Sequence, residues 1–265
     1  MGILICPVCR EKLDVSGKNF ICTNRHSFDI SRSGYVNLLL SKHTGKTIHG
    51  DNKLMVNSRR DFLKKGFYAP LREAICENIK SGIILDAGCG EGYYTSGIKN
   101  ISPDSEVYGI DISKTAVEMA SKTYKNITFA VASVFNIPVA DSSSDTLVTV
   151  FSPYCSNEFQ RVLKNNGTML MAIPSVNHLW ELKQAVYDTP YRNDVRPYEL
   201  DGFQFICTKR INYQFLLSSN QDIQSLFSMT PYYYRTGKSQ QEKLFQLENL
   251  EVTADFELLE YKKLL

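Results

Sequence analysis

Long apolar runs are absent from this chain of 265 residues. No stretch approaches the roughly 18 apolar residues of a membrane-spanning helix, so we expect no membrane partner. The first residues, MGILICPVCREK, do not place a charged segment before a long apolar one, and they do not resemble a signal peptide. A strong net charge is also absent, since the formal value is +2. With 43% hydrophobic residues, the composition is that of a globular protein.

Cysteine and histidine form one ordered pattern near the N-terminus. The pattern C-x2-C, twelve residues, C-x3-H is made by Cys6, Cys9, Cys22 and His26. This spacing puts two ligands in each of two tight turns, as a tetrahedral zinc site requires. Four protein ligands leave no open position for a reactive water, so the sequence predicts a structural zinc. The alternative is four unrelated buried side chains.

A metal would also explain how so short a segment folds. We expect a zinc-binding module over residues 1–36, which is too small to bury a sufficient core by itself. The other four cysteines are scattered and suggest a reducing cytoplasm rather than disulfides. They are Cys76, Cys89, Cys155 and Cys207.

Basic residues are concentrated at the start of the chain. Residues 1–60 contain ten Lys or Arg against four Asp or Glu, a net +6, which leaves −4 for the remainder. This asymmetry favours a polyanionic partner for the first module, although a solvated basic surface would look the same. Arg59 and Arg60 close this region, and we expect both to contact RNA if the polyanion is RNA.

From residue 83 the pattern alternates between strands and helices. The expected strands are Ile83–Asp86, Glu106–Asp111, Ile127–Val131, Thr146–Ser152 and Thr168–Ile173. The expected helices are Tyr93–Lys99, Lys114–Lys122 with Ser113 as its cap, and Asn157–Leu163. This order predicts an α/β fold with a mostly parallel, doubly wound sheet in a large domain over residues 81–265.

The flanking segments are less regular. Between the module and the large domain, we expect a linker and a helical segment over residues 37–80, with a polar loop over 41–58. A helix is expected over Arg59–Lys80, with Gly66 and Pro70 interrupting it near Tyr68. Further on, we expect a helix at Leu179–Val186 and a loop over 187–202. Two late strands, Phe203–Leu217 and Leu250–Leu259, would form an antiparallel pair.

A glycine-rich loop closes the first strand, in the run LDAGCGEG at 85–92. Gly88 and Gly90 let the backbone turn tightly and approach a ligand, and Asp111 at the end of the second strand would accept bonds from ribose hydroxyls. The dinucleotide spacing G-x-G-x-x-G fails here. Glu91 would repel a pyrophosphate but tolerates a sulfonium, which favours S-adenosylmethionine over NAD.

Two further residues could contact that cofactor. Asp86 is placed to approach its cationic end, and Ser133, after the third strand, could meet the adenine edge. An ordinary loop-forming role for Ser133 remains an equal alternative.

The run DAGCGEGYYT at 86–95 resembles the first motif of class I methyltransferases, which have a Rossmann-like fold. Together with the zinc pattern it resembles the bacterial large-subunit (23S) ribosomal RNA guanine-N1 methyltransferases. Further matches are RHSFD at 25–29, GYVNLL at 34–39, RR-x-FL at 59–63, HLWELK at 178–183 and MTP at 229–231. One departure is SPYC at 152–155, where the family pattern is Ala-Pro-Cys.

The resemblance implies a function and a set of contacts. It implies methyl transfer from S-adenosylmethionine to N1 of a guanine in a hairpin loop of large-subunit ribosomal RNA, in the cytoplasm. By the same resemblance Cys6, Cys9, Cys22 and His26 would hold zinc. Contacts to the cofactor would come from Tyr68, Gly90, Glu91 and His178. A homodimer is the assembly we consider.

Guanine N1 carries a proton at neutral pH, so a general base would help the transfer. His178 has a suitable ordinary pKa of about 6.5, yet it could equally be a capping residue, and we name no catalytic residue. Two rival functions remain. One is a small-molecule methyltransferase with a zinc-stapled substrate lid, and the other is a non-catalytic RNA-binding protein.

Overall fold

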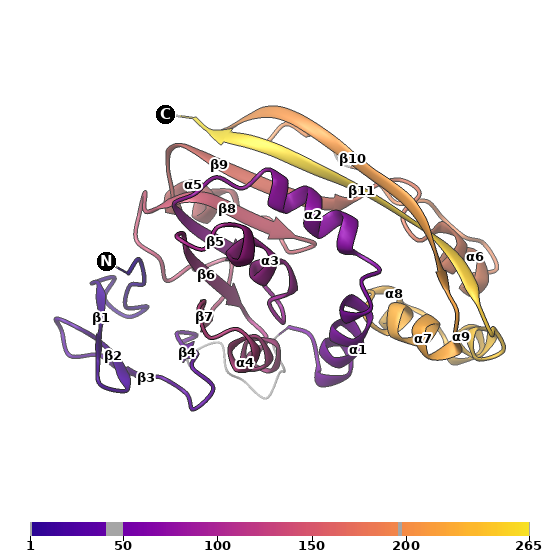
Figure 1. Cartoon of the computed structure of the whole chain (residues 1–265), viewed down its shortest axis with the longest axis horizontal. Coiled ribbons are helices and arrows are strands. Elements are labelled where there is room, and N and C mark those ends of the chain that lie inside the picture. Colours follow the sequence, from indigo (N-terminus) through magenta and orange to yellow (C-terminus); the bar gives the residue numbers. More distant parts are fainter. Residues whose placement is uncertain (1, 41–49, 196–197, 265) are drawn as a thin grey trace.

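The computed structural model of the protein describes residues 2–40, 50–195 and 198–264. A sheet with the strand order β10-β11-β9-β8-β5-β6-β7-β4 forms its centre (Figure 1). These strands are β4 (Val36–Asn37), β5 (Ile83–Ala87), β6 (Glu106–Asp111), β7 (Thr128–Val131), β8 (Ser144–Val150), β9 (Leu163–Pro174), β10 (Phe203–Leu217) and β11 (Leu250–Lys263).

The strands from β4 to β9 pair in parallel, and β11 pairs antiparallel with both β9 and β10. The five strands expected from residue 83 onward and the antiparallel final pair are therefore confirmed. Successive strands run outward in one direction from β5 to β7 and in the other from β8 to β9. The order thus reverses beside β5, where sheets of this kind bind their ligands.

The helices expected between the strands are present: α3 (Tyr93–Ile101), α4 (Lys114–Thr123), α5 (Ser156–Val162) and α6 (Trp180–Val186). Ser113 caps α4 as expected, since its hydroxyl accepts a hydrogen bond from the backbone N–H of Ala116. The sequence missed three helices after β10, namely α7 (Asn220–Ser228), α8 (Tyr232–Arg235) and α9 (Lys238–Phe245).

The interruption expected near Tyr68 within the helical segment is confirmed, whereas the expected start of that segment at Arg59 is wrong. Two helices, α1 (Lys53–Lys64) and α2 (Ala69–Glu77), are separated by a turn in which Gly66 has a φ of +81°. Pro70 sits in the first turn of α2, where its missing N–H is not needed. The loop expected over 41–58 is also wrong at its end, because α1 begins at Lys53. Residues 41–49 of that expected loop lie outside the described residues.

Alternate residues of the strands supply two apolar layers. Ile84 and Val148 face a cluster with buried residues of α1 to α4, whereas Leu85 and Leu147 face a second cluster with Phe159 of α5. The second cluster also contains residues of the N-terminal module: Ile3, Leu4, Cys6, Leu13 and Cys22. Helices and the module together therefore cover the sheet.

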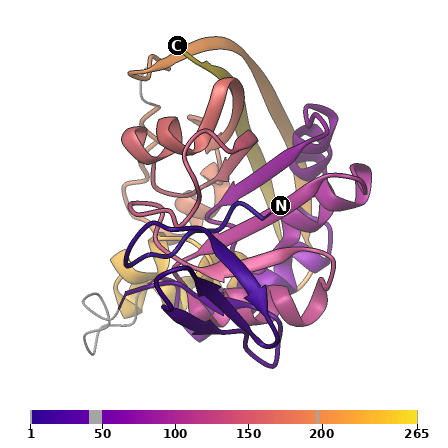
Figure 2. The same cartoon turned by 90° about the vertical axis from the view of Figure 1, so that its left-hand side faces the viewer.

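The N-terminal module contains a small antiparallel sheet of β1 (Leu13–Ser16), β2 (Asn19–Cys22) and β3 (Ser27–Asp29). Figure 2 shows this indigo segment nearest the viewer. It docks through backbone hydrogen bonds from Ile5 N–H to the Pro138 carbonyl (3.0 Å) and from Ala140 N–H to the Ile3 carbonyl (2.9 Å). The segment of residues 132–143 that links β7 to β8 thus carries the module. No helix among the described residues is long and apolar enough to cross a membrane.

Gly109 in β6 leaves no room for a methyl group. A Cβ there would lie 2.7 Å from the ring of Phe129 and 3.0 Å from Sγ of Cys89. We expect Gly109→Ala to lower the free energy of unfolding by about 1–3 kcal/mol, because the buried neighbours must shift. Urea denaturation measures this change. Gly2→Ala is the control, since its Cβ meets only the Tyr108 hydroxyl at 3.6 Å. Equal stability of the two variants would contradict this packing.

Candidate functional site

Four side chains gather at the metal-like pattern. The ligand atoms of Cys6, Cys9, Cys22 and His26 all lie within 4.8 Å of one another. His26 Nδ1 is 3.5 Å from Sγ of Cys6 and of Cys22, and the Sγ atoms of Cys9 and Cys22 are 3.6 Å apart. Zinc bonds of about 2.1 to 2.3 Å in a tetrahedron put ligand atoms roughly 3.6 to 3.8 Å apart, so three thiolates and one imidazole fit a closed zinc site.

The local backbone presents these ligands in two similar turns. Arg10 N–H bonds to the Cys6 carbonyl (2.8 Å), and Arg25 N–H bonds to the Cys22 carbonyl (2.9 Å). Both arginines adopt a positive φ, of 66° and 63° respectively. A bound metal offsets such backbone strain, which supports a structural role.

The glycine-rich loop joins β5 to α3 at the switch point. Gly88 has a φ of +90°, and a Cβ there would lie 2.3 Å from Oγ of Ser152, the second residue after β8. Gly90 has a φ of +54°, and a Cβ there would lie 3.1 Å from the Arg59 guanidinium. Any larger residue would therefore close the space in front of the loop.

Three carboxyl groups surround this loop, and two of them, Asp86 and Glu91, are buried. Asp86 accepts a hydrogen bond from Thr95 (2.6 Å), and burial raises the pKa of Asp86 from 3.8 to about 7. Asp111 accepts bonds from Gly90 N–H (3.0 Å) and Ser113 N–H (2.7 Å), and burial also raises its pKa. The third is Glu91, which is 8% exposed. A cationic ligand would relieve the cost of holding these acids together.

Arg59 of α1 supplies a cation at this place. Its Nε donates to Glu91 at 2.7 Å, and its Nη1 donates to Asp51. Burial would lower the pKa of the guanidinium, but the charges of Glu91 and Asp51 outweigh that effect and raise it. The sequence predicts Arg59 as an RNA contact, and the structure instead places it against the cofactor loop. Only Arg60, which pairs with its exposed neighbour Asp61, keeps the expected outward position.

A second group of site residues centres on His178, just before α6. Its Nδ1 accepts from Asp255 N–H (3.3 Å), and its Nε2 lies 3.4 Å from the Tyr68 hydroxyl. The ring packs 4.5 Å from Phe256. Burial lowers the pKa of His178 to about 3, so the imidazole is neutral at physiological pH and is a poor acceptor for a substrate proton.

The structure thus places the predicted cofactor residues in two groups. Asp86, Gly88, Gly90, Glu91 and Asp111 line one loop cluster, and Tyr68 with His178 forms the other. No hydrogen bond among the described residues joins the two groups. Ser133 directly follows Ala132, whose N–H bonds to the Asp111 carbonyl (3.0 Å), and its own Oγ accepts from Phe135 N–H (3.2 Å).

The sequence did not single out Phe151 or Ser152 at the end of β8 for the cofactor site. Phe151 adopts a φ of +54° and stacks on His178, with ring centroids 6.4 Å apart. Ser152 meets Gly88. The end of β8 therefore contacts both groups, and the expected departure from Ala-Pro-Cys falls at this junction. Both residues directly follow a strand that ends where the strand order reverses, and ligands bind there in sheets of this kind. This position in the sheet is the signal that could have identified Phe151 and Ser152.

The buried acids Asp86 and Glu91 and the open backbone of the glycine loop fit a cationic cofactor. The donor set of the module fits zinc equally well.

The zinc cluster generates one prediction. Cys9→Ala should release the metal and unfold residues 2–29, because only a small core remains there. Elemental analysis should give one zinc per wild-type chain and none in the variant, while calorimetry shows unchanged S-adenosylmethionine binding. Cys207→Ala, an exposed cysteine outside the cluster, is the control. Wild-type protein purified without chelator that contains no zinc would contradict the assignment.

Asp86 generates a prediction about pH. Its pKa is raised in the folded state, so its contribution to stability is fully present below about pH 3.8 and is lost as pH rises through about 7. We expect Asp86→Asn to become more stable than the wild type across this window, by up to about 4 kcal/mol at pH 8. Urea denaturation of cofactor-free protein at pH 5 and pH 8 measures the difference. A difference that does not change with pH would contradict the burial of an ionisable Asp86.

Known proteins resemble this chain in both parts. Residues 79–228 match the family described as "Methyltransferase domain", and residues 4–44 match the zinc ribbon described as "RlmA, N-terminal". The crystal structure of the YcgJ protein from Bacillus subtilis shares the fold, with a TM-score of 0.50, 15% identity and coverage of 73% of this chain and 98% of that one.

Two curated relatives are similar to this chain over more than two thirds of its length. YxjB of Bacillus subtilis, provisionally named a 23S rRNA (guanine-N(1)-)-methyltransferase, is 35% identical over 96% of this chain and 95% of its own length. The 23S rRNA (guanine(748)-N(1))-methyltransferase of Streptomyces fradiae is 32% identical over 69% of this chain and 67% of its own. The zinc ribbon, the glycine loop and this similarity together show that the chain belongs to the zinc-ribbon family of class I, S-adenosylmethionine-dependent methyltransferases whose relatives are named for guanine N1 of 23S ribosomal RNA.

Proposed function

We propose that the protein transfers a methyl group from S-adenosylmethionine to N1 of a guanine in a hairpin loop of large-subunit ribosomal RNA. The observation that carries this proposal is the joining of a zinc ribbon to the edge of a methyltransferase sheet. Val36 and Asn37 of β4 pair with β7 and form the outer edge of that sheet, with β6 and β7 between β4 and β5. The basic N-terminal region is thereby joined to the sheet that carries the glycine loop, and its positive charge suits the phosphates of RNA.

The cofactor, when bound, supplies an electrophilic methyl group on a sulfonium. The proposed cofactor contacts are Tyr68, Asp86, Gly88, Gly90, Glu91, Asp111, Ser133 and His178. Within this set, the glycines leave backbone exposed to the ligand and the carboxylates face positive charge, as methionine's ammonium and the sulfonium require. Cys6, Cys9, Cys22 and His26 would hold the zinc, which would stabilise the ribbon.

The chain's main task in such a displacement is to hold the reacting atoms close and in line. His178 is neutral and buried, and together with Tyr68 it can form a rigid wall of the site. Neither side chain needs to gain or lose a proton in this role. The N1 proton of guanine must leave during the reaction, and His178, whose pKa lies at about 3, is unsuited to accept it.

Methylation of a small molecule under a zinc-stapled lid is the weaker alternative, because the relative that covers 96% of this chain is named for ribosomal RNA. A cytoplasmic location follows from the proposed substrate. A homodimer stays a prediction, which sedimentation equilibrium tests.

The proposed substrate generates a prediction about RNA structure. A guanine in a loop exposes its N1 edge, whereas a paired guanine hides it. We expect a large-subunit hairpin to be methylated and the same guanine annealed into a duplex to react at least 100-fold more slowly. Tritium transfer from labelled S-adenosylmethionine measures both rates. Equal rates on the hairpin and the duplex would contradict loop recognition, and transfer to neither RNA would favour a small-molecule substrate.

A further inference from the structure

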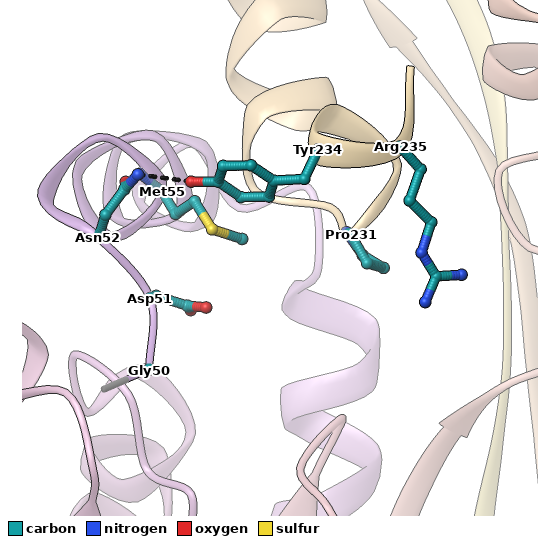
Figure 3. A pocket seen from close by; sticks show the side chains of 7 residues that line it. All are labelled: Gly50, Asp51, Asn52, Met55, Pro231, Tyr234 and Arg235. Carbon is teal, nitrogen blue, oxygen red and sulfur yellow. Dashed lines mark hydrogen bonds between the residues drawn. The ribbon is translucent and has the colours of Figure 1, made fainter. Parts of the chain in front are cut away.

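A cavity of about 500 Å³ lies between the start of α1 and α8 (Figure 3). Its lining residues are Gly50, Asp51, Asn52, Met55, Pro231, Tyr234 and Arg235. This volume falls within the roughly 300–1,000 Å³ of pockets that hold small ligands. None of these residues belongs to the cofactor contacts proposed above.

One wall of this cavity contacts the segment that follows β6 and, through Arg59, the glycine loop. Asp51 accepts a bond from Arg59, which also holds Glu91, and the Asp51 carbonyl accepts from the Ser113 hydroxyl at 3.0 Å. A Cβ on Gly50 would lie 2.8 Å from the side chain of Ile112, the residue after Asp111. The cavity therefore adjoins the place where the methyl donor binds.

The lining presents three groups that are ready for a ligand. Tyr234 is 57% exposed, and its hydroxyl accepts a hydrogen bond from the side-chain amide of Asn52. Arg235 has no ion pair or side-chain hydrogen bond within residues 2–40, 50–195 and 198–264. The same holds for Oδ1 of Asp51, whose Oδ2 binds Arg59. Figure 3 shows Asp51 pointing into the space below the Tyr234 ring, with Arg235 on the far side.

A flat ring, a carboxylate oxygen and a guanidinium together match one kind of nucleotide. Aromatic rings stack on unpaired bases, and guanidinium groups bind phosphate. A carboxylate oxygen accepts from an amino group. Guanine carries an amino group on C2, next to N1, whereas adenine has only a hydrogen on C2 and carries its amino group on C6.

We propose that this cavity is the subsite for the target guanosine. Tyr234 stacks on the base, Oδ1 of Asp51 accepts from its 2-amino group, and Arg235 binds a neighbouring phosphate. The assignment rests on the proposed function and adds the residues that choose guanine. Asp51, which would bind the base, pairs with Arg59, and Arg59 also pairs with Glu91 in the glycine loop. Two ion pairs therefore link the base-binding residue to the cofactor loop.

Full-length variants at Tyr234 and Arg235 test the stacking and phosphate contacts. With an unmethylated large-subunit hairpin that the wild type accepts as substrate, Tyr234→Ala should raise the RNA KM about tenfold, since stacking on an aromatic ring is worth that much per base. Tyr234→Phe is the matched control, because it keeps the ring and removes only the hydroxyl, and it should behave like the wild type. Arg235→Gln should raise the RNA KM and reduce the salt dependence of binding by about one phosphate contact. Calorimetric S-adenosylmethionine affinity should stay within twofold in all three.

Inosine tests the contact of Asp51. A hairpin with inosine at the target position lacks the 2-amino group and should lower kcat/KM of the wild type about tenfold. In Asp51→Ala the ratio of kcat/KM for guanosine over inosine should fall to about one. A smaller folded fraction of the variant would lower both kcat/KM values by the same factor, so it would not change their ratio.

Each failure has its own signature. A wild type that methylates no guanine in the hairpin overturns the proposed function and this subsite with it. An active wild type with an unchanged RNA KM in Tyr234→Ala overturns the subsite alone. A loss of S-adenosylmethionine affinity in Tyr234→Ala as large as the rise in RNA KM would show that the cavity holds the cofactor instead.

Discussion

The ion pairs of Arg59 hold the cofactor site together. One guanidinium of α1 bridges Asp51, just before that helix, and Glu91 in the glycine loop, while Asp86 lies buried nearby and Asp111 is half-buried. Loss of Arg59 would leave the buried carboxylate of Glu91 without its partner, and such an uncompensated charge is destabilising. The ion pairs of Arg59 therefore help to fix the position of α1 and of the cavity between α1 and α8. The same ion pairs hold the glycine loop, which would bind the cationic cofactor.

The zinc ribbon is part of the core of the larger domain. Ile3 and Leu4 enter the apolar layer beneath Ile110 and Val139, and a backbone bridge joins Leu4 to Val139. Covering a sheet face with a metal-stabilised module gives that module a fixed orientation relative to the glycine loop. RNA bound by the basic N-terminal region would consequently meet the cofactor at a defined distance and angle.

Regular patterns made much of this architecture predictable. The ligand spacing of Cys6 to His26 and the strand–glycine–helix run at 83–95 follow local rules, and the cofactor follows from Glu91 within the loop. The position of Arg59 was not predictable, because a basic residue in a basic segment looks like an RNA contact until tertiary packing brings Glu91 against it. Two of the three helices after β10, α8 and α9, were missed because Pro231 and Gly237 interrupt short segments. Ser219, which caps α7, is the signal that could have identified that helix.

The proposed reaction transfers one methyl group to N1 of a single guanine. The most direct measurement is mass spectrometry of nucleosides from a large-subunit hairpin incubated with the protein and S-adenosylmethionine labelled with ¹³C in the methyl group. The account predicts labelled 1-methylguanosine, in one equivalent per hairpin, from a guanine in the loop. Label at another nitrogen, on another base, or recovered only in small molecules would contradict it.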